Sequence, residues 1–433
     1  MLDPKLIREN PDLIKKTCKQ KGIKLDVDKL LQIDEEKREI LKQVEALKAE
    51  KNKASEKIAQ LDGEEKKSAI AEMQKVSEEE KKLIPKLQEL EAEFLSLALL
   101  VPTPQSKETP EGKDDTENVE LRTWGELPKF DFQPLDHVTL AEKCDLVDMP
   151  RGAKVAGTRS YYLKNEGAQL EVALLMYTWD KLIEKGFTPM IVPNIVNYQP
   201  MMGTSYFPGG EEQAYAVGVE RVRGEGVESD NKYLAGTAEV ALTSYRSDEI
   251  LSQEDLPLKS CGWSTCYRRE AGTYGKDTHG LYRVHQFQKI EQVIVCEANM
   301  EKSQEMHDLL LKNAEEVLQD LNLPYRVVAV CTGDMGQGQY YKNDIETWMP
   351  SRESYGETHS CSNFLDFQAR RLNLRYKDNE GKIKFCYTLN NTCIASPRVL
   401  IPILEIYQQK DGSIAVPEVL QKYMGNKKTI DPR

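Results

Sequence analysis

The part of the chain richest in side chains that could do chemistry is residues 266–295, CYRREAGTYGKDTHGLYRVHQFQKIEQVIV. Two β-like runs flank a loop rich in Gly and charge, and the second run places His285, Phe287, Lys289 and Glu291 on one face of a strand. Phe287 and Glu291 would lie about 13 Å apart. At that spacing the Phe287 ring could stack under a purine while the Glu291 carboxylate pairs with a cationic amine.

The first run of the same segment adds a guanidinium and a second carboxylate. Arg268 and Glu270 are two residues apart, so we expect them to share a face of the neighbouring strand. An Arg side chain can bind a phosphate through two parallel hydrogen bonds. An ordinary β-hairpin with charges facing solvent would explain any one of these residues taken alone.

A second group of candidate residues follows Cys386, in CYTLNNTCIASPRVLIPILEIYQQ. Ser396 is a good helix N-cap and Pro397 a good first helical residue. Arg398 would then project from a helix N-terminus, where the backbone amides already favour an anion. The pattern predicts a polyphosphate site, although most arginines in a first helical turn are structural or solvated.

The elements that precede these residues begin with a predicted helical hairpin. Apolar residues recur at 3-4 spacing over residues 30–61 and again over 69–101, separated by a turn-like Asp-Gly pair. Lys37 and Lys51 fill gaps in the first series, and Glu80 interrupts the second. Two helices of similar length, each about 50 Å long, must fold back on each other when a short turn joins them. A coiled coil used only for dimerisation or as a spacer is the alternative to a binding arm.

The composition changes after residue 100. The stretch VPTPQSKETPEGKDD is rich in Pro and charge and lacks periodicity, which marks a linker. Beyond it, several β-like runs follow one another without helices between them, which favours an antiparallel sheet in an α+β domain over a βαβ fold. We predict a helical arm over 1–104 with its hairpin at about 28–101, a linker over 105–118, an α+β domain over 119–425 and a polar tail over 426–433.

Overall composition excludes several classes of protein. A chain of 433 residues, 39% hydrophobic, suits two domains, and it contains no long apolar run and no signal-peptide pattern, so we expect a cytoplasmic protein without membrane contact. Nine cysteines without a C-x-x-C pair argue against a disulfide framework and a zinc knuckle. The net charge of -12 argues against a polyanionic partner, although a local basic stripe could still bind RNA, and we expect no DNA partner.

Residues 267–291 closely resemble motif 2 of class II aminoacyl-tRNA synthetases. They follow the form found in seryl-tRNA synthetases, F-R-x-E-A-G-x-x-G-x-D-T-x-G-L-x-R-x-H-Q-F-x-K-x-E, with Tyr for the first Phe. The resemblance implies that Arg268 grips the α-phosphate of ATP and the serine carboxylate. It also implies that Glu270 binds the adenine amino group, Phe287 the adenine face and Glu291 the serine ammonium.

The segment from Cys386 resembles motif 3 of the same family, T-L-N-G-S-G-x-A-x-x-R-x-L. By that resemblance Arg398 contacts the γ-phosphate. The chain has Asn391, Thr392 and Cys393 where Gly-Ser-Gly is commonest. Thr392 therefore keeps the hydroxyl of a substrate-binding serine and adds a methyl group.

Three further stretches are similar to the family. GTAEVAL contains a T-A-E signature whose threonine, Thr237, would contact the bound serine, and MIVPNIV resembles the motif 1 strand that forms the dimer interface. ETHSCSNFLDFQARR, with His359 in place of the commoner serine, would hold Mg²⁺ through Glu357 and Ser360. Oxygen ligands suit this ion, and their odd spacing implies a bend or a bulge, because a regular strand would put them on opposite faces. GDMGQG lacks the spacing of a phosphate loop and is predicted to be an ordinary loop.

The resemblance implies a class II catalytic domain in the α+β part and a complete set of site residues. Catalytic roles fall to Arg268 and Arg398, and the serine site to Thr237, Glu239, Arg268, Glu291 and Thr392. The ATP site comprises Arg268, Arg269, Glu270, Arg283, Val284, Phe287, Glu357, Thr358, His359, Ser360 and Arg398, with Glu357 and Ser360 as ligands of Mg²⁺.

The implied reaction joins L-serine to the 3′ end of tRNA(Ser) with ATP, in a homodimer whose amino-terminal hairpin grasps the tRNA. Basic residues on the outer faces of that hairpin are candidate phosphate contacts, namely Arg38, Lys42, Lys48, Lys53 and Lys57. The sequence leaves open whether tRNA(Sec) is also charged with serine. Two alternatives are a catalytically silent RNA-binding relative, disfavoured by the retained motif residues, and a ligase that loads a carrier protein, disfavoured by the long hairpin.

Overall fold

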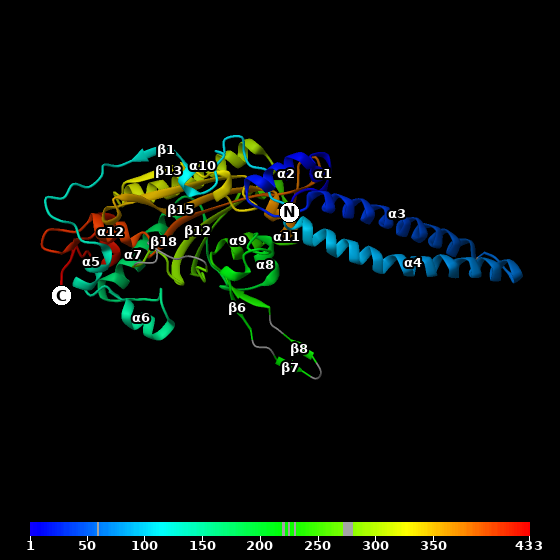
Figure 1. The fold of residues 1–433 in the computed structure, drawn as a ribbon, viewed down its shortest axis with the longest axis horizontal. Helices are drawn as coiled ribbons and strands as arrows, with labels where there is room; N and C mark the ends of the chain where they lie inside the picture. Colours follow the sequence, from blue (N-terminus) through cyan, green and yellow to red (C-terminus); the bar gives the residue numbers. More distant parts are fainter. Residues whose placement is uncertain (59, 219–220, 224–225, 229–230, 272–279) are drawn as a thin grey trace. The chain divides into compact units, whose positions relative to one another are not determined.

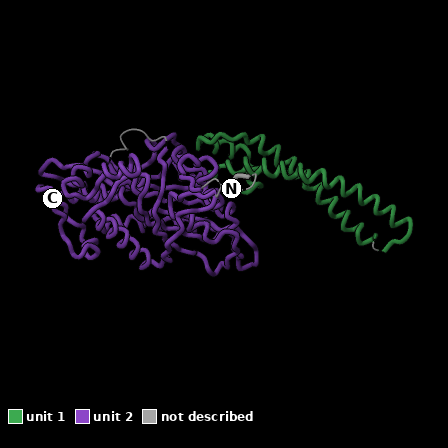
Figure 2. The backbone as a smooth tube through the Cα atoms, turned by 90° about the horizontal axis from the view of Figure 1, so that it is seen from below, with its two compact units in different colours: residues 1–104 green, residues 105–433 purple. Residues whose placement is uncertain are grey.

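The chain folds into two compact units, residues 1–104 and residues 105–433 (Figures 1 and 2). The computed structural model describes every residue except 59, 219–220, 224–225, 229–230 and 272–279. The first unit is helical and the second is built on a mostly antiparallel sheet, so the predicted α+β class is confirmed.

The first unit is dominated by a helical hairpin. Two short helices, α1 (Pro4–Glu9) and α2 (Pro11–Gln20), precede the long helices α3 (Val27–Ile58) and α4 (Gly63–Ala98), which pack along each other (Figure 1). Their facing apolar residues are buried where the sequence pattern is regular, among them Leu30 and Val44 on α3 and Leu90 on α4. The predicted long hairpin is therefore confirmed.

The polar residues that interrupt the two apolar series all have partners within this hairpin. Lys51 of α3 is paired with Glu80 of α4 at 3.0 Å between Nζ and Oε2, and the Glu80 side chain is only 10% exposed. Lys37 lies 3.2 Å above the centre of the Phe94 ring and 3.3 Å from a carboxylate oxygen of the buried Asp34. Because each polar residue requires its own partner, these contacts favour one register of the two helices.

The second unit is built on an eight-stranded sheet whose strand order is β1-β13-β14-β15-β18-β12-β11-β4. Neighbouring strands are antiparallel except β4, which lies parallel to β11 at the edge. The strands are β1 (Val119–Trp124), β4 (Thr188–Ile191), β11 (Leu258–Tyr267), β12 (Gln286–Cys296), β13 (Tyr325–Ala329), β14 (Tyr341–Met349), β15 (Ser354–Leu365) and β18 (Tyr387–Ser396).

Helices and small sheets surround this large sheet. The long helices α7 (Asn165–Glu184) and α10 (Met300–Asp320) pack on its central strands. The main apolar core is buried between these helices and the sheet. The shorter helices are α5 (His137–Lys143), α6 (Met149–Ala156), α8 (Tyr198–Gly203), α9 (Glu239–Ser244), α11 (Phe367–Leu372), α12 (Leu400–Ile406) and α13 (Glu418–Gln421).

The small sheets mostly pair strands that are close in the chain, and β10 with β16 is the distant pairing among the described residues. They comprise β2 (Val147–Asp148) with β3 (Tyr162–Leu163); β5 (Ile195–Asn197), β9 (Lys232–Leu234) and β6 (Tyr215–Val217); β7 (Arg221–Arg223) with β8 (Gly226–Glu228); β10 (Ile250–Ser252), β16 (Arg375–Lys377) and β17 (Ile383–Phe385); and β19 (Ile414–Ala415) with β20 (Thr429–Ile430). The nine cysteines are all buried thiols. Among the described residues, no helix is both long and apolar enough to cross a membrane.

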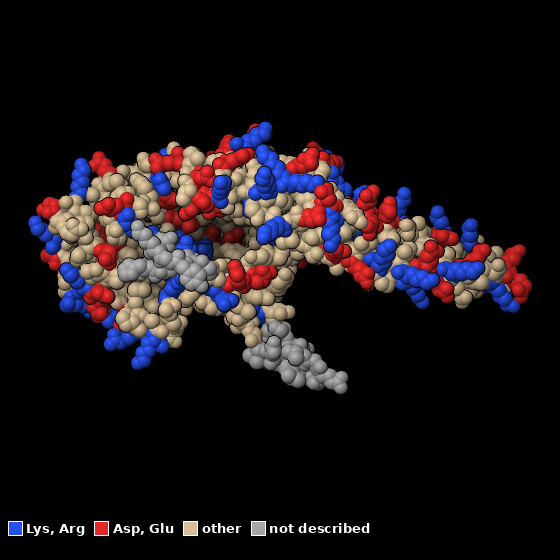
Figure 3. Space-filling view, in the orientation of Figure 1, with Lys and Arg blue, Asp and Glu red and all other residues tan. Residues whose placement is uncertain are grey.

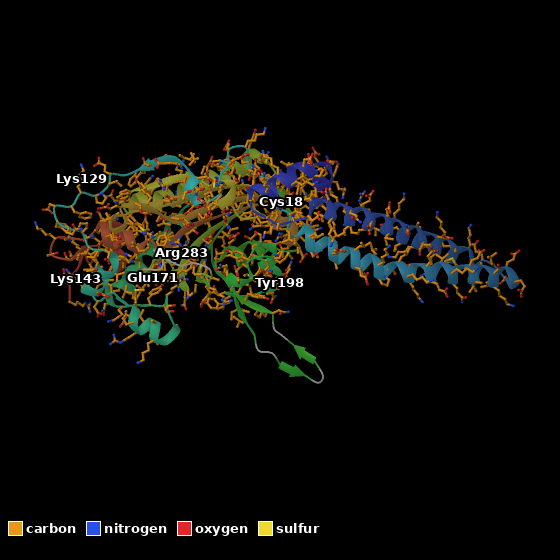
Figure 4. All side chains as sticks on the ribbon, viewed as in Figure 1. Cys18, Lys129, Lys143, Glu171, Tyr198 and Arg283 are labelled. Atoms are coloured by element: carbon orange, nitrogen blue, oxygen red, sulfur yellow. The ribbon has the colours of Figure 1, made fainter. Side chains whose placement is uncertain are left out.

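Two segments differ from the sequence expectation. MIVPNIV is two strands rather than one, because β4 ends before Pro193, which has no N–H to donate, and β5 joins a different sheet. The last residues, expected to form a polar tail, include β20, whose Ile430 is 2% exposed and belongs to the main core. The backbone N–H of Arg433 donates to the carbonyl of Lys143, which is labelled in Figure 4, at 2.9 Å.

The partly buried ion pair in the hairpin gives a testable asymmetry. We expect Lys51→Met to lower the free energy of unfolding of the chain by about 1–3 kcal/mol, because it leaves the buried Glu80 carboxylate without its partner. Adding Glu80→Leu should recover most of that loss, since both charges are then gone. Urea unfolding followed by circular dichroism measures both changes.

The exposed pair Lys67–Glu64, whose side chains are 76% and 88% exposed, supplies the matched control. Glu64→Ala should change the free energy of unfolding by less than about 0.5 kcal/mol. An effect of Lys51→Met as small as that of Glu64→Ala would contradict the proposed role of the buried pair.

Candidate active site

A cavity of about 290 Å³ opens beside β12, β15 and β18 in the second unit. It collects many of the residues singled out in the sequence, although they come from segments more than a hundred residues apart. Those that line it are Arg268, Glu270, Val284, Phe287, Glu357, Thr358, Ser360, Thr392 and Arg398.

One part of the cavity joins an aromatic ring, a guanidinium and a carboxylate. The Arg268 guanidinium carbon lies 5.3 Å from the centre of the Phe287 ring, and Glu270 accepts a 3.2 Å hydrogen bond from Arg283, which is labelled in Figure 4. The expected strand face was wrong, because β11 ends at Tyr267 and the backbone of Glu270 has a φ of 47°. Arg268 and Glu270 reach the cavity from the end of the strand instead.

A β-bulge places Glu357 and Ser360 on the same side of β15. Glu357 pairs with Glu346 of β14 and Ser360 pairs with Asp344, so Thr358 is the extra residue in the ladder. Because Glu346 and Asp344 are two residues apart, their partners face the same way, and the predicted bulge is confirmed. Both Glu357 and Ser360 line the cavity.

The charge of Glu357 is set by its surroundings. Burial acts to raise the pKa of this carboxyl, but Arg398 and Lys342, with smaller effects from Arg268, outweigh burial and hold the pKa below its usual range. The group is therefore a carboxylate at neutral pH.

Arg398 lies in the turn before a helix rather than in its first turn, so the predicted capping arrangement was wrong. Ser396 is the last residue of β18, and its hydroxyl donates to a carboxylate oxygen of Glu171 at 2.6 Å instead of capping the helix. The helix α12 begins only at Leu400. Arg398 is held by other contacts: it donates to the backbone carbonyl of Glu357 at 3.0 Å and stacks 4.5 Å from the centre of the Tyr282 ring.

The base of the cavity carries a buried polar cluster of Lys289, Glu291 and Thr392. Glu291 is ion-paired with Lys289, and the Thr392 hydroxyl donates to Glu291 at 3.3 Å. A second bulge makes this possible, because the register between β12 and β18 skips Cys393 and so places Thr392 opposite Glu291. Glu291 itself is 2% exposed and lies behind Lys289 and Thr392, which line the cavity.

Thr237 and Glu239 lie beside this cluster without lining the cavity. Glu239 accepts a 2.8 Å hydrogen bond from Gln368, and α9 can approach β11 closely because a Cβ at Gly262 would lie 2.8 Å from the Cβ of Ala238. Burial raises the pKa of Glu239 to about 7, and repulsion from the Glu291 carboxylate adds to the rise. The Thr237 hydroxyl accepts from the backbone N–H of Glu239 at 3.2 Å.

Arg269, Arg283 and His359 also lie outside the cavity lining. Arg269 donates its backbone N–H to Gln213 at 3.0 Å. His359 is buried against the Thr358 hydroxyl at 2.8 Å, and burial lowers the pKa of its imidazole to about 3. The Gly-rich loop of the 266–295 segment falls largely on residues 272–279, outside the described residues.

Family models match both units of the chain. A model described as "Seryl-tRNA synthetase N-terminal domain" matches residues 1–104, and one described as "tRNA synthetase class II core domain (G, H, P, S and T)" matches residues 222–407. The serine–tRNA ligase of Deinococcus radiodurans is 45% identical over 430 residues, which cover 99% of each chain. The chain belongs to the seryl-tRNA synthetase family. Its activity is that of a serine–tRNA ligase.

Solved structures of this family have the same fold over the whole chain. A seryl-tRNA synthetase from Pyrococcus horikoshii, complexed with ATP, is 38% identical with a TM-score of 0.89 and full coverage of both chains. The cytoplasmic serine–tRNA ligase from Naegleria fowleri, in complex with AMP, is 32% identical with a TM-score of 0.85, covering 100% of this chain and 99% of that one.

Sequence reasoning missed several residues of the cavity of this ligase. The sequence pattern puts Lys289 on the correct strand face but indicates no role for it, and it indicates no role for the loop that contains GDMGQG. The structure adds Tyr282, Lys289, Asp334, Gly336, Gln339 and Lys342 to the lining. The alternation of Lys289 with Phe287 and Glu291 could have identified the lysine, whereas nothing local to the GDMGQG loop indicates that it reaches this cavity.

The raised pKa of Glu239 predicts a dependence of stability on pH. The folded chain holds this proton up to about pH 7, whereas the unfolded chain releases it near the ordinary value of 4.5, so the folded state loses stability relative to the unfolded state as the pH rises between these values. Glu239→Gln removes this contribution. We expect the variant to gain about 2–3 kcal/mol on wild type between pH 4.5 and pH 7.5 in urea unfolding.

The exposed Glu254→Gln, measured in parallel, controls for the loss of one carboxylate. Parallel stability curves for wild type and Glu239→Gln over this pH range would refute the assignment.

Proposed function

We propose that this ligase activates L-serine with ATP through the cavity described above, forming seryl-adenylate and pyrophosphate, and then transfers serine to the 3′ end of tRNA(Ser). The observation that carries the assignment is the convergence of Arg268, Phe287 and Arg398 on one cavity whose base is the Glu291 cluster. The reaction needs no protein nucleophile, because the serine carboxylate itself attacks the α-phosphate. Positioning and neutralisation of charge are then sufficient.

In this assignment the adenine ring lies against Phe287 and its amino group is bound by Glu270. Arg268, already stacked near Phe287, binds the α-phosphate and the serine carboxylate. Arg398 binds the γ-phosphate, held for that purpose by Glu357 and Tyr282. A developing negative charge on the phosphates is thus met by fixed cations that need little rearrangement. The Pyrococcus horikoshii relative, which was solved with ATP, supports a nucleotide in this fold.

The residues present fit a Mg²⁺ ion. Glu357 and Ser360 face the same way across the Thr358 bulge, and the lowered pKa of Glu357 keeps its carboxylate ionised, as an oxygen ligand of a hard cation must be. When bound, the ion would neutralise the ATP phosphates. Arg398 would stay beside Glu357 and share that task.

We assign the serine ammonium to Glu291, and Thr392 and Thr237 to the same subsite. Thr392 already bonds Glu291, and Glu239 lies close enough to Glu291 for their charges to interact. Lys289 neutralises Glu291 in the structure, so binding of the ammonium must change the contact between these two side chains.

The hairpin is proposed to grasp tRNA(Ser). Basic and acidic side chains are mixed along both helices (Figure 3), so the contacts must come from individual lysines rather than from a continuous basic surface. Arg38 is a weaker candidate than the others, because its guanidinium is bonded to Asp34 at 3.1 Å.

A homodimer is also proposed, through the edge strand β4 of motif 1. Ile191 of β4 is 79% exposed and Ile195 of β5 is 54% exposed, and both line one surface pocket, which leaves an apolar surface beside the edge of the large sheet.

Amino-acid-dependent exchange of pyrophosphate into ATP tests the assignment. Serine should support rapid exchange and the other common amino acids should not. Glu291→Ala should raise the serine KM by roughly ten- to a hundredfold and the ATP KM by much less, because a charge-assisted hydrogen bond is worth about 1.5–3 kcal/mol. Glu301→Ala, on the exposed face of α10, is the control.

Faster exchange with another amino acid would defeat the proposed specificity. Equal effects of Glu291→Ala on both substrates would remove Glu291 from the serine subsite. A chain that supports no exchange but binds tRNA would be the catalytically silent alternative.

The hairpin makes a separate prediction. Replacing residues 28–101 with a short Gly/Ser linker should leave serine-dependent exchange intact, because the large sheet and its core belong to residues 105–433. Charging of tRNA(Ser) should fall sharply, and the tRNA affinity of the intact enzyme should weaken with salt. If the shortened enzyme charges tRNA as well as the intact one, the hairpin is only a spacer.

A further inference from the structure

The segment expected to be a free linker is bonded along much of its length to a loop of the second unit. Residues 106–118, here called the strap, run beside residues 331–340. The backbone N–H of Ser106 donates to Tyr340 at 2.8 Å, that of Thr332 to Pro110 at 3.0 Å, and that of Gly333 to Gly112 at 2.9 Å. The strap therefore has a defined position on the second unit.

Side chains reinforce this contact. Asn118 bonds both ends of a short stretch of the loop: its Nδ2 donates to a carboxylate oxygen of Asp334 at 3.1 Å, and its Oδ1 accepts from the backbone N–H of Cys331 at 2.9 Å. The Thr332 hydroxyl donates to the carbonyl of Gly112 at 3.1 Å. One asparagine thus satisfies a donor and an acceptor of the loop at once.

Two glycines allow the strap and the loop to approach so closely. A Cβ at Gly112 would lie 2.7 Å from the sulfur of Cys331, and a Cβ at Gly333 would lie 2.2 Å from the carbonyl oxygen of Lys113. Neither position has room for a side chain unless the two segments separate. Glycine at positions 112 and 333 is therefore required for the strap and the loop to pack this closely.

The loop held by the strap is a wall of the cavity. Asp334, Gly336 and Gln339 line it, on the side that also carries Lys342 and Glu357. The far end of the wall is fixed separately, since Gln339 accepts from the backbone N–H of Gly336 at 2.6 Å and donates to Ser362 of β15 at 2.8 Å. The near end, around Asp334, depends on the strap.

We propose that the strap is a positioning element of the nucleotide site, in which Asn118 orients Asp334 and so holds the cavity wall formed by the 331–340 loop. The inference rests on the assignment of this cavity to ATP. The strap begins two residues after the helical unit ends at Pro104, so the chain that leaves the tRNA-binding unit is fixed to the wall of the ATP site. Asp334 also contributes to the field that keeps the neighbouring Lys342 charged, because it acts with Asp344 and Glu357 to raise the pKa of that lysine against the effect of burial.

Serine-dependent pyrophosphate exchange by full-length variants tests the proposal. Asn118→Ala should raise the ATP KM on the order of tenfold, with the serine KM and kcat changed less than about threefold. Gly112→Ala, which forces the strap away from Cys331, should act in the same direction. The control is Thr116→Ala, because Thr116 bonds Asp114 within the strap at 2.6 Å and makes no described contact with the loop; it should leave all three parameters unchanged.

An exchange of the two side chains separates positioning from general destabilisation. Asn118→Asp alone places two carboxylates together and should weaken ATP use at least as much as Asn118→Ala. The double variant Asn118→Asp/Asp334→Asn restores an amide-to-carboxylate hydrogen bond in the reverse sense, and should lower the ATP KM well below that of Asn118→Asp. The thermal midpoint of each variant is measured alongside.

An unchanged ATP KM in Asn118→Ala, or a double variant no better than its single parent, would overturn the proposal. So would a loss of kcat and of both KM values in proportion to the fall in thermal midpoint, since that describes a purely structural contact. If wild type itself shows no serine-dependent exchange, it is the assigned function that fails.

Discussion

A β-strand presents every second side chain to the same face, and this constraint decides which residues of the chain can meet a ligand. The proposed active site of this ligase depends on breaking that alternation twice. The extra residue Thr358 brings Glu357 and Ser360 to one side of β15, and the extra residue Cys393 brings Thr392 opposite Glu291. Without these bulges the carboxylate and hydroxyl of β15 would face opposite sides, and Glu291 would face a cysteine.

The second organising feature is the balance of buried charge. Arg268, Lys289 and Arg398 would repel one another in a site of low dielectric constant if they were alone. Each has an anionic or carbonyl partner, with Glu291 against Lys289 and the backbone of Glu357 against Arg398. The cavity can therefore hold several cations together, as the proposed binding of phosphates requires. The same crowding keeps Glu239 from ionising freely, because its burial and the nearby Glu291 carboxylate raise its pKa to about 7.

The helical unit and the sheet unit use polar residues for different purposes. In the hairpin, Lys51 and Glu80 occupy positions where apolar residues would give a more uniform interface, and the cost is met by a specific pairing of the two helices. In the second unit, Asn118 and Thr332 use their hydrogen bonds to attach the connecting segment to a wall of the cavity. A connection that looks like a flexible linker by composition thus becomes part of the architecture of the site.

The sequence by itself determined the elements that depend on local pattern. The 3-4 spacing of apolar residues was enough to predict the hairpin, because it follows from the geometry of a single helix. The odd spacing of Glu357 and Ser360 predicted a bend or bulge only once the family resemblance had made both residues ligands of one ion. The motifs shared with seryl-tRNA synthetases supplied the roles proposed for Arg268, Phe287 and Glu291. Only the tertiary structure decided contacts between segments distant in the chain: the hydroxyl of Ser396 goes to Glu171 instead of a helix cap, Ile430 completes the core, and Asn118 reaches Asp334. The partners in the two hydrogen bonds are 216 or more residues apart in the chain. The local sequence around one partner therefore does not indicate which residue the other partner is. These pairings depend on how the strands stack into one sheet, which is set by the packing of the whole domain.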